Sequence, residues 1–252
     1  MMVTRIKTPK EVTAMRESGK ILANILQIVK NQTRVGLSTK DLSKIAKSEL
    51  SKTKGTPTFL GYRGYPDVIC ISINDEIVHG IPRADKIIVD GDIVSLDFGV
   101  TYDGMITDGA ISFIVGTPKS RDDQVLVEAT LESLYRGIAV VKNGATVGDI
   151  GFAVAEVLNR HHYGIVRDLV GHGVGHHLHE IPNIPNYGNK NTGPMLSAGM
   201  TIAIEPMATL GDYHIDIDND DWTVRTADKS RSAHFEHTVL ITDNGAEILT
   251  KA

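Results

Sequence analysis

The 252-residue sequence is poor in several features that would have pointed to particular classes of protein. A single cysteine, Cys70, allows no internal disulfide and fits a reducing compartment. No apolar run approaches the length of a membrane span, and the first residues, MMVTRIKTPKEV, lack the apolar core of a signal peptide. Acidic and basic residues are interspersed at a net charge of −5, so no basic patch indicates nucleic-acid binding. We therefore expect a cytoplasmic protein that binds neither membranes nor nucleic acid.

What the sequence does contain is typical of a globular protein. Hydrophobic residues make up 41% and charged residues 23%, and the chain is long enough to bury a sizeable core. Thr8 and Glu11 form a capping box around Pro9, which predicts a helix from there to about residue 30. Two further helices are predicted over 38–52 and 121–141.

Residues 93–108, IVSLDFGVTYDGMITD, predict a β-hairpin that carries two carboxylates. A four-residue loop at 101–104 would close Val100 against Met105 and place Asp97 directly opposite Asp108, on one face of the sheet. Two like charges so placed repel, and oxygen ligands at this spacing suit hard divalent cations. Taken alone, the stretch fits equally well a solvated hairpin whose aspartates face water.

The sequence repeats itself at an offset of 108 residues. The pattern G-x-[ST]-x-x-D-[IL] occurs at 36–42 and again at 144–150. The residue 108 positions after Asp97 is Glu205, so the carboxylate of the first hairpin has a counterpart in the second half. We predict a single domain over 1–252, with two pseudo-two-fold-related helix-helix-hairpin halves at roughly 8–116 and 117–252.

Two more motifs lie in the second half. GHGVGHHLHE at 171–180 carries four histidines, including His172 and His179, although a solvated polar loop would also explain it. FEHTVLI at 235–241 predicts a strand in which Glu236 points to one face, and a buried Glu is uncommon unless it is paired or bound to metal. Four carboxylates and one imidazole suit a pair of divalent metals such as Mn, Fe(II), Co or Zn. The candidate ligands are Asp97, Asp108, His172, Glu205 and Glu236.

With VHG, SLDFG, TDGA, GHGVG, IEPM and FEHT around these residues, the sequence resembles type I methionine aminopeptidases along essentially the whole chain. The resemblance implies an α+β pita-bread fold with a curved antiparallel sheet. It also implies a metalloaminopeptidase with two divalent metal ions (Co, Mn, Fe(II), Zn or Ni). Such an enzyme removes the initiator methionine from nascent proteins and peptides and prefers a small second residue.

The resemblance also assigns roles to individual residues. Asp97 would chelate one metal, Asp108 and Glu236 would bridge, and His172 and Glu205 would complete the other site. Glu205 would also act as a general base, while His79 and His179 would contact the reacting peptide. A methionine pocket is implied at Phe59, Tyr62, Tyr65, Cys70, Leu178 and Trp222. A monovalent cation is implied near Asn74 and Ser232.

Several points stay open on the sequence alone. The pocket residues could be ordinary core, and Phe59 and Leu178 depart from the Cys and Phe that are frequent in bacterial relatives. A Xaa-Pro aminopeptidase of the same fold is one alternative, although residues 1–7 leave no space for its usual extra N-terminal domain. A non-catalytic binding protein of this fold is the other. We expect a monomer whose partners are nascent polypeptide N-termini, with an encounter at the ribosome left open.

Overall fold

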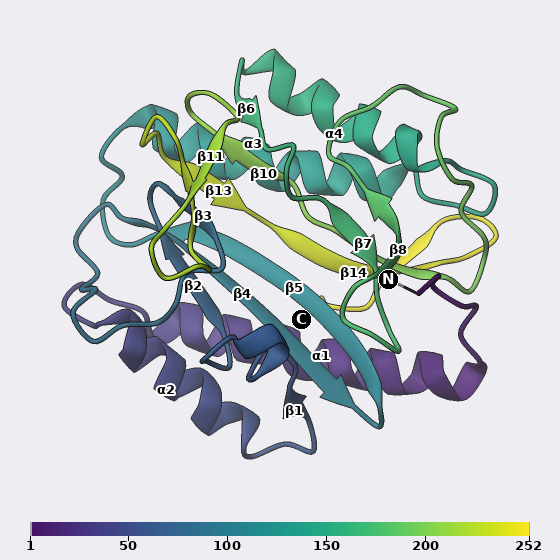
Figure 1. Ribbon diagram of the computed structural model, residues 1–252, viewed down its shortest axis with the longest axis horizontal. Coiled ribbons are helices and arrows are strands. Elements are labelled where there is room, and N and C mark those ends of the chain that lie inside the picture. Colours follow the sequence, from purple (N-terminus) through teal and green to yellow (C-terminus); the bar gives the residue numbers. More distant parts are fainter. Residues whose placement is uncertain (1, 252) are drawn as a thin grey trace.

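The structure is a computed structural model that describes residues 2–251. Within this range a nine-stranded sheet has the order β1-β4-β5-β14-β9-β7-β8, with β2 paired to β4 and β15 to β14 (Figure 1). Its strands are β1 (Thr56–Pro57), β2 (Cys70–Ile73), β4 (Ile93–Tyr102), β5 (Met105–Ile114), β7 (Gly171–Gly173), β8 (Glu180–Ile184), β9 (Thr201–Ile204), β14 (Glu236–Ile241) and β15 (Ala246–Ile248).

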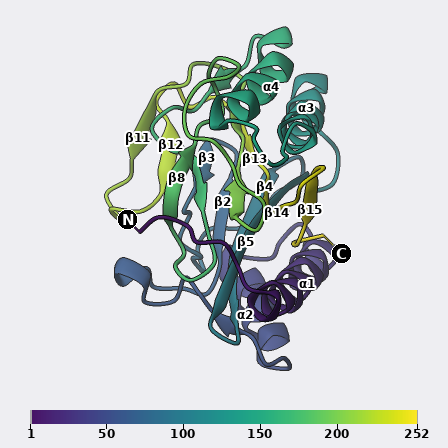
Figure 2. The same cartoon turned by 90° about the vertical axis from the view of Figure 1, so that its right-hand side faces the viewer.

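Two small sheets flank the large one. Among residues 2–251 each has three strands, in the orders β13-β10-β6 and β11-β12-β3. Their strands are β3 (Glu76–Val78), β6 (Gly164–Ile165), β10 (Met207–Thr209), β11 (Ile215–Ile217), β12 (Val224–Thr226) and β13 (Ser232–His234). Figure 2 shows β11 and β12 on the opposite side of the strands from α3 and α4.

The helices are α1 (Pro9–Gln32), α2 (Thr39–Leu50), α3 (Arg121–Ala139) and α4 (Val147–Arg160). A short 3-10 helix, η1, covers Tyr62–Gly64. The predicted capping box between Thr8 and Glu11 is present, as is the one at the start of α2. The three helices predicted from sequence are therefore confirmed, with ends that differ by about two residues. Helix α1 packs on β4 and β5, while α3 and α4 cover the other half of the molecule (Figure 1).

The repeat read from the sequence is a structural repeat. The Gly36 amide donates to Ile88 O at 2.9 Å, and the Gly144 amide donates to Leu196 O at 2.9 Å. Both the donors and the acceptors are separated by the same 108 residues. Strands β5 and β14, one from each half, lie side by side at the centre of the sheet, so the two hairpins meet there. This arrangement confirms the predicted pita-bread architecture.

The register predicted for the first hairpin is wrong by two residues. The turn contains only Asp103 and Gly104, with φ values of 47° and 76°, and Tyr102 pairs with Met105. Positive φ at both central residues is the geometry of a type I′ turn, which matches the twist of the flanking strands and favours Asp-Gly. Asp97 therefore lies opposite Ala110 and not opposite Asp108. A shift of two residues preserves the face, so both carboxylates still project from the same side of the sheet.

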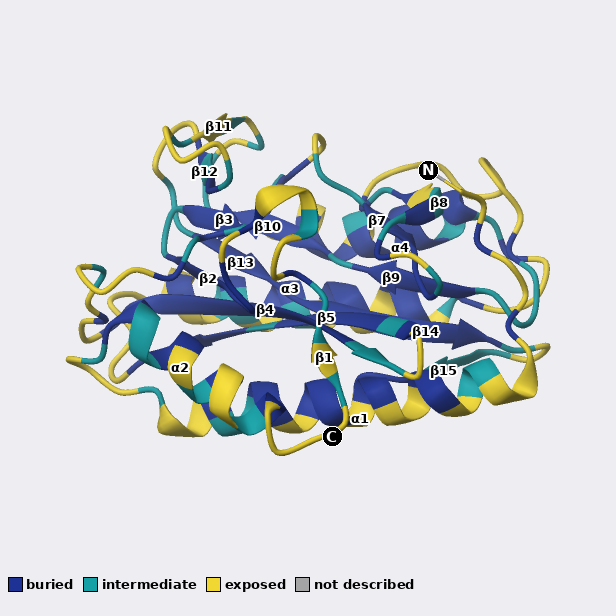
Figure 3. Ribbon diagram, turned by 60° about the horizontal axis from the view of Figure 1, so that its bottom comes forward, coloured by how far each residue is buried: buried dark blue, intermediate teal, exposed yellow. Residues whose placement is uncertain are grey.

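The core lies between the helices and the large sheet. Figure 3 shows buried strands β4, β5 and β14 above helix α1, whose outer face is exposed. One apolar cluster joins α1 and α2 to β2, β4 and β5, and another joins α3 and α4 to β9 and β14. Each pair of helices thus packs against the strands of one half of the sheet.

Substitutions in helix α1 test how much its packing against the sheet stabilises the fold. Leu22 is fully buried beside β5, with Gly109 close to its side chain, whereas Lys20 is exposed on the same helix. Leu22→Ala is expected to lower the free energy of unfolding by about 3 kcal/mol, because it removes buried methyl groups and leaves a cavity. Lys20→Ala should change it by less than about 0.5 kcal/mol. Urea unfolding followed by circular dichroism would measure both, and equal effects would contradict the packing described.

Candidate functional site

The five predicted ligands come together on one face of the sheet. Asp97 lies on β4, Asp108 on β5, His172 on β7 and Glu236 on β14, while Glu205 directly follows β9. Single ligand atoms of Asp108, His172 and Glu236 lie within 4.8 Å of one another. His172 Nε2 lies 3.6 Å from Glu205 Oε1. Strand pairing through the centre of the sheet therefore brings Asp97 and Asp108 of the first half together with Glu205 and Glu236 of the second half.

These carboxylates are buried, so the alternative of a solvated hairpin is wrong. Asp97 is 8% exposed and Asp108 4%. Burial raises the pKa of Asp97 to about 7, and burial together with the nearby Asp97 charge raises the pKa of Glu205 to about 8. Burial and neighbouring carboxylates raise the pKa values of Asp108 and Glu236 well above their ordinary range. The cluster therefore resists carrying several negative charges unless cations join it.

The donor set fits divalent metal ions. Among residues 2–251, Asp97 Oδ1 and Glu236 Oε1 have no hydrogen-bond partner although both atoms are buried. Buried carboxylate oxygens without partners are costly, and metal coordination is one of the ways proteins satisfy them. Burial, and to a lesser extent His179, lowers the pKa of His172 to about 3, which keeps this imidazole neutral and able to ligate.

The cluster opens into a cavity of about 420 Å³. All six predicted pocket residues line it, together with His79 and His179. Its wall also includes residues that were not predicted from the sequence: Arg63 in η1, Val78 on β3, Asn183 on β8, and Asp168, Leu169 and Val170 in the segment before β7. The predicted metal ligands and the predicted pocket residues thus line the same cavity.

One end of the cavity is apolar. Phe59, Tyr65, Cys70 and Leu178 form a buried cluster against which Trp222 packs. The rings of Tyr65 and Trp222 meet edge to face, with centroids 5.0 Å apart. Burial raises the pKa of the Cys70 thiol, so this group stays protonated and weakly polar. The arrangement can hold an unbranched apolar or thioether side chain.

The two predicted histidines flank the cluster. Burial lowers the pKa of His79 to about 4, and burial with the nearby Arg63 charge lowers that of His179 to about 4, so both are neutral near pH 7. Tyr62 Oη lies 2.8 Å from His179 Nδ1. The ring centroids of His172 and His179 are 4.4 Å apart. Because His172 is buried and His179 lines the cavity, the predicted alternative of a merely solvated histidine loop is wrong.

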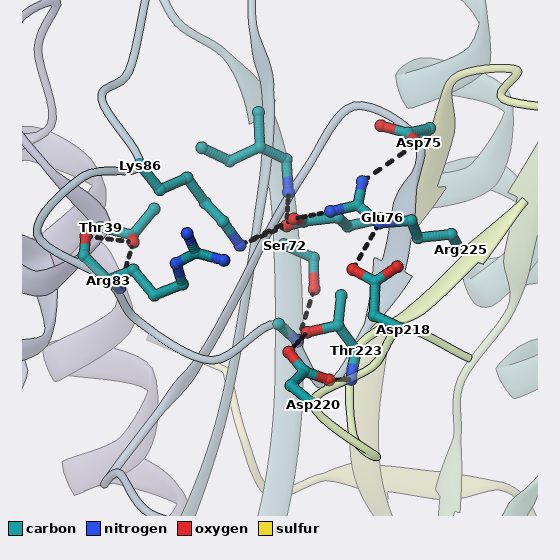
Figure 4. A network of polar contacts seen from close by, with 12 residues as sticks. Thr39, Ser72, Asp75, Glu76, Arg83, Lys86, Asp218, Asp220, Thr223 and Arg225 are labelled. Atoms are coloured by element: carbon teal, nitrogen blue, oxygen red, sulfur yellow. Dashed lines mark hydrogen bonds and ion pairs between the residues drawn. The ribbon is translucent and has the colours of Figure 1, made fainter. Parts of the chain in front are cut away.

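A network of charged groups around Arg225 lies next to one wall of the cavity, and Figure 4 shows the network. Arg225 on β12 donates to Glu76 at 2.8 Å, to Asp75 at 3.0 Å and to Asp218 at 2.6 Å. Glu76 lies on β3, which pairs with β12. His79 directly follows β3 and Trp222 shortly precedes β12. The network therefore locks together the two strands that carry these cavity residues.

The structure also brings Asn74 and Ser232 together. The Ser232 hydroxyl donates to Asn74 O at 2.9 Å and to Glu76 O at 3.1 Å. Asn74 has a φ of 60°, which turns its backbone at the end of β2. Two carbonyl oxygens and a hydroxyl thus meet at this turn.

Sequence reasoning missed His234. It is 1% exposed, and its Nε2 lies 3.7 Å from Glu205 Oε2. The alternation of strand residues offered a signal, because period 2 along SAHFEHT places residue 234 on the same face as Glu236. The strand predicted from the sequence begins at Phe235, one residue after this histidine.

Comparison with known proteins agrees with this geometry. The profile of Metallopeptidase family M24 matches residues 13–243. Methionine aminopeptidase 1 of Bacillus subtilis is 44% identical over 97% of this chain and 98% of its own length. The methionine aminopeptidase of Escherichia coli is 40% identical over 99% of this chain and 94% of its own length. The crystal structure of the Thermotoga maritima methionine aminopeptidase superposes with a TM-score of 0.97 at 44% identity, covering 99% of this chain and 100% of that one.

A more distant likeness concerns the Pyrococcus furiosus prolidase. It has a TM-score of 0.78 at 25% identity, and the match covers 98% of this chain but only 65% of that one. Within the described part of the chain, no helix is both long and apolar enough to cross a membrane.

The raised carboxylate pKa values predict a pH dependence of stability without metal. His79, His172 and His179, whose pKa values are lowered, are neutral in the folded chain near pH 7, and an unfolded histidine, with a pKa of about 6.5, is mostly neutral there too. The folded cluster still holds protons that the unfolded carboxylates have lost, so stability is lost as pH rises through the folded pKa values. Metal-free protein in EDTA is therefore expected to melt at a lower temperature at pH 8 than at pH 7.

Glu205→Gln should flatten this slope, because it removes one of the titrating groups. Saturating Mn²⁺ should also weaken it, since the cation replaces the protons. Differential scanning fluorimetry would measure the melting temperatures. A wild-type protein that melts higher at pH 8 in EDTA would contradict the electrostatics described.

Proposed function

The chain belongs to metallopeptidase family M24, and we propose that it removes the initiator methionine from nascent proteins and peptides whose second residue is small. Removal of an N-terminal methionine rests on the likeness to methionine aminopeptidases over nearly the full length of both chains. The observation that carries the proposal is the single cavity in which the carboxylate–histidine cluster adjoins an apolar pocket.

The proposed metal site takes two divalent cations. Asp97 would hold one, Asp108 and Glu236 would be shared, and His172 and Glu205 would complete the other. The unpartnered oxygens of Asp97 and Glu236 support this assignment, and oxygen-rich ligation with one imidazole accepts Co, Mn, Fe(II), Zn or Ni. Such cations supply Lewis acidity and lower the pKa of water.

The chain's own groups would orient the peptide and move protons. Glu205 would accept, at a carboxylate oxygen, the proton of the water that attacks the first peptide bond. If the Tyr62 hydroxyl donates to His179 Nδ1, the ring N–H lies at Nε2, where it can donate to the carbonyl oxygen as negative charge develops. His79 would contact the substrate amide or the departing amine.

The pocket would set the specificity. Phe59, Tyr65 and Cys70 close the apolar end, Tyr62, Leu178 and Trp222 complete the wall, and a flexible thioether side chain suits such a surface. The enzyme would act only on the first residue of a peptide because it needs a free N-terminal amine. Such an amine has a pKa of about 8, so it can lose its proton near neutral pH and bind a metal ion. The methionine aminopeptidase relatives, which match over nearly the full length of both chains, favour this assignment over a Xaa-Pro aminopeptidase.

The remaining assignments are parts of the same proposal. The carbonyls of Asn74 and Glu76, with the Ser232 hydroxyl, would hold a monovalent cation at the turn after β2. The partners would be nascent polypeptide N-termini, which a monomer could meet as they leave the ribosome.

A peptide assay tests the proposed function. With Mn²⁺, Co²⁺ or Fe²⁺, the wild-type protein is expected to release Met from Met-Gly-Met-Met and to leave a peptide with proline in second position and a first residue other than Met intact. Asp108→Ala should reduce release to background, because it removes a shared oxygen ligand, whereas Asp122→Ala in the exposed first turn of α3 should not. Chromatography of the products would measure both peptides. Rapid cleavage before proline, or metal-independent release by Asp108→Ala, would overturn the proposal.

A further inference from the structure

The Glu205 carboxylate lies between two imidazoles. Its Oε1 faces His172 Nε2 at 3.6 Å, and its Oε2 faces His234 Nε2 at 3.7 Å. His172 is one of the proposed metal ligands, whereas His234 has no role in the function proposed above. The structure therefore places a second histidine, His234, beside the Glu205 oxygen that does not face His172.

Hydrogen bonds fix the backbone of His234, but its imidazole ring makes none among the described residues. Its amide donates to Ser112 Oγ at 2.9 Å, and its carbonyl accepts from the same hydroxyl at 2.7 Å. It also pairs with Met207, two residues after Glu205. Among residues 2–251, neither ring nitrogen has a hydrogen-bond partner, although the side chain is buried. Leaving such a group unpaired costs free energy, so its fixed position beside Glu205 requires an explanation.

Within the described residues, the cavity wall includes Glu205 but not His234, so the histidine lies behind the carboxylate. Asn186 Nδ2 also donates to the Glu205 backbone carbonyl at 2.9 Å, which fixes the main chain there. With the backbone fixed, the remaining freedom of Glu205 is the rotation of its side chain. The gap to His234 is about 0.7 Å longer than an ordinary hydrogen bond, which a small rotation would close.

We propose that His234 is a positioning residue that donates from Nε2 to Glu205 Oε2 and so turns Oε1 toward His172 and the metal site. The proposal rests on the metal site proposed above and adds a residue that acts through Glu205. Groups that hydrogen-bond to metal ligands orient them, and losing such a group typically lowers metal affinity about 10- to 100-fold. The effect should therefore appear in metal binding itself as well as in activity.

The test measures the Kd for Mn²⁺ by isothermal titration calorimetry on the metal-free protein. His234→Leu removes the donor and is expected to raise the Kd of the weakened site about 10- to 100-fold. His234→Gln keeps an N–H that can reach a similar place, so it should stay within about threefold of wild type.

His237→Gln is the matched control. His237 is also buried and adjoins Glu236, but its Nδ1 lies 2.9 Å from Thr250 Oγ1 on the other face of β14. Its substitution should leave the Mn²⁺ Kd unchanged, and melting of each metal-free variant reports whether it is folded.

The outcomes separate the two proposals. If wild type binds Mn²⁺ and releases Met, the inference fails when His234→Leu binds as tightly as wild type, when His234→Gln loses as much affinity as His234→Leu, or when His237→Gln loses as much. If wild type neither binds metal nor releases Met, the proposed function itself fails. The positioning role is supported if His234→Leu weakens Mn²⁺ binding while His234→Gln and His237→Gln keep a Kd close to that of wild type.

Discussion

Four buried carboxylates repel one another at the centre of this protein, and the surrounding strands hold them together against that repulsion. Asp97, Asp108, Glu205 and Glu236 lie together on the face of the large sheet that the helices leave free, and burial strengthens every interaction between their charges. A cluster of this kind is tolerated only if protons or cations neutralise it. Membership of a metallopeptidase family and the unpartnered carboxylate oxygens both indicate cations.

The duplication explains how one chain builds such a cluster. Each half contributes a hairpin or its counterpart, and β5 and β14 join the halves at the centre. Thr238 ties this junction, because its hydroxyl donates to Asp108 O at 2.8 Å and accepts from the Asp108 amide at 2.9 Å. The strand that carries Glu236 thereby fixes the strand that carries Asp108. The site belongs to neither half alone.

Polar contacts outside the sheet hold the cavity's loops against the cluster. Arg225 and its three carboxylate partners, which Figure 4 shows, join β3 to β12 next to Trp222. On the other side, the buried Lys7 contacts Glu180 at 3.4 Å, and Glu180 accepts from the amides of His176 and His177. The N-terminal segment thus anchors the loop that carries His179. Specificity and catalysis depend on parts of the chain that are widely separated in sequence.

Short-range patterns in the sequence were enough to predict three helices and the internal repeat. Capping residues and apolar spacing placed α1, α2 and α3 to within about two residues, and the 108-residue repeat predicted the paired halves. Alternation along the strands put Asp97 and Asp108 on one face, and the resemblance supplied a ligand set that the fold gathers in one place.

Tertiary structure decided what depends on distances between loops and strands far apart in the chain. The hairpin register is one example, because a two-residue and a four-residue turn both fit the sequence around Asp103, and both leave the aspartates on one face. Asp168 and Leu169 reach the cavity from an irregular segment whose path no local periodicity predicts. His234 gained its position beside Glu205 only through the pairing of β13 with β10. Local patterns fix which face a side chain occupies, and packing fixes what it meets there.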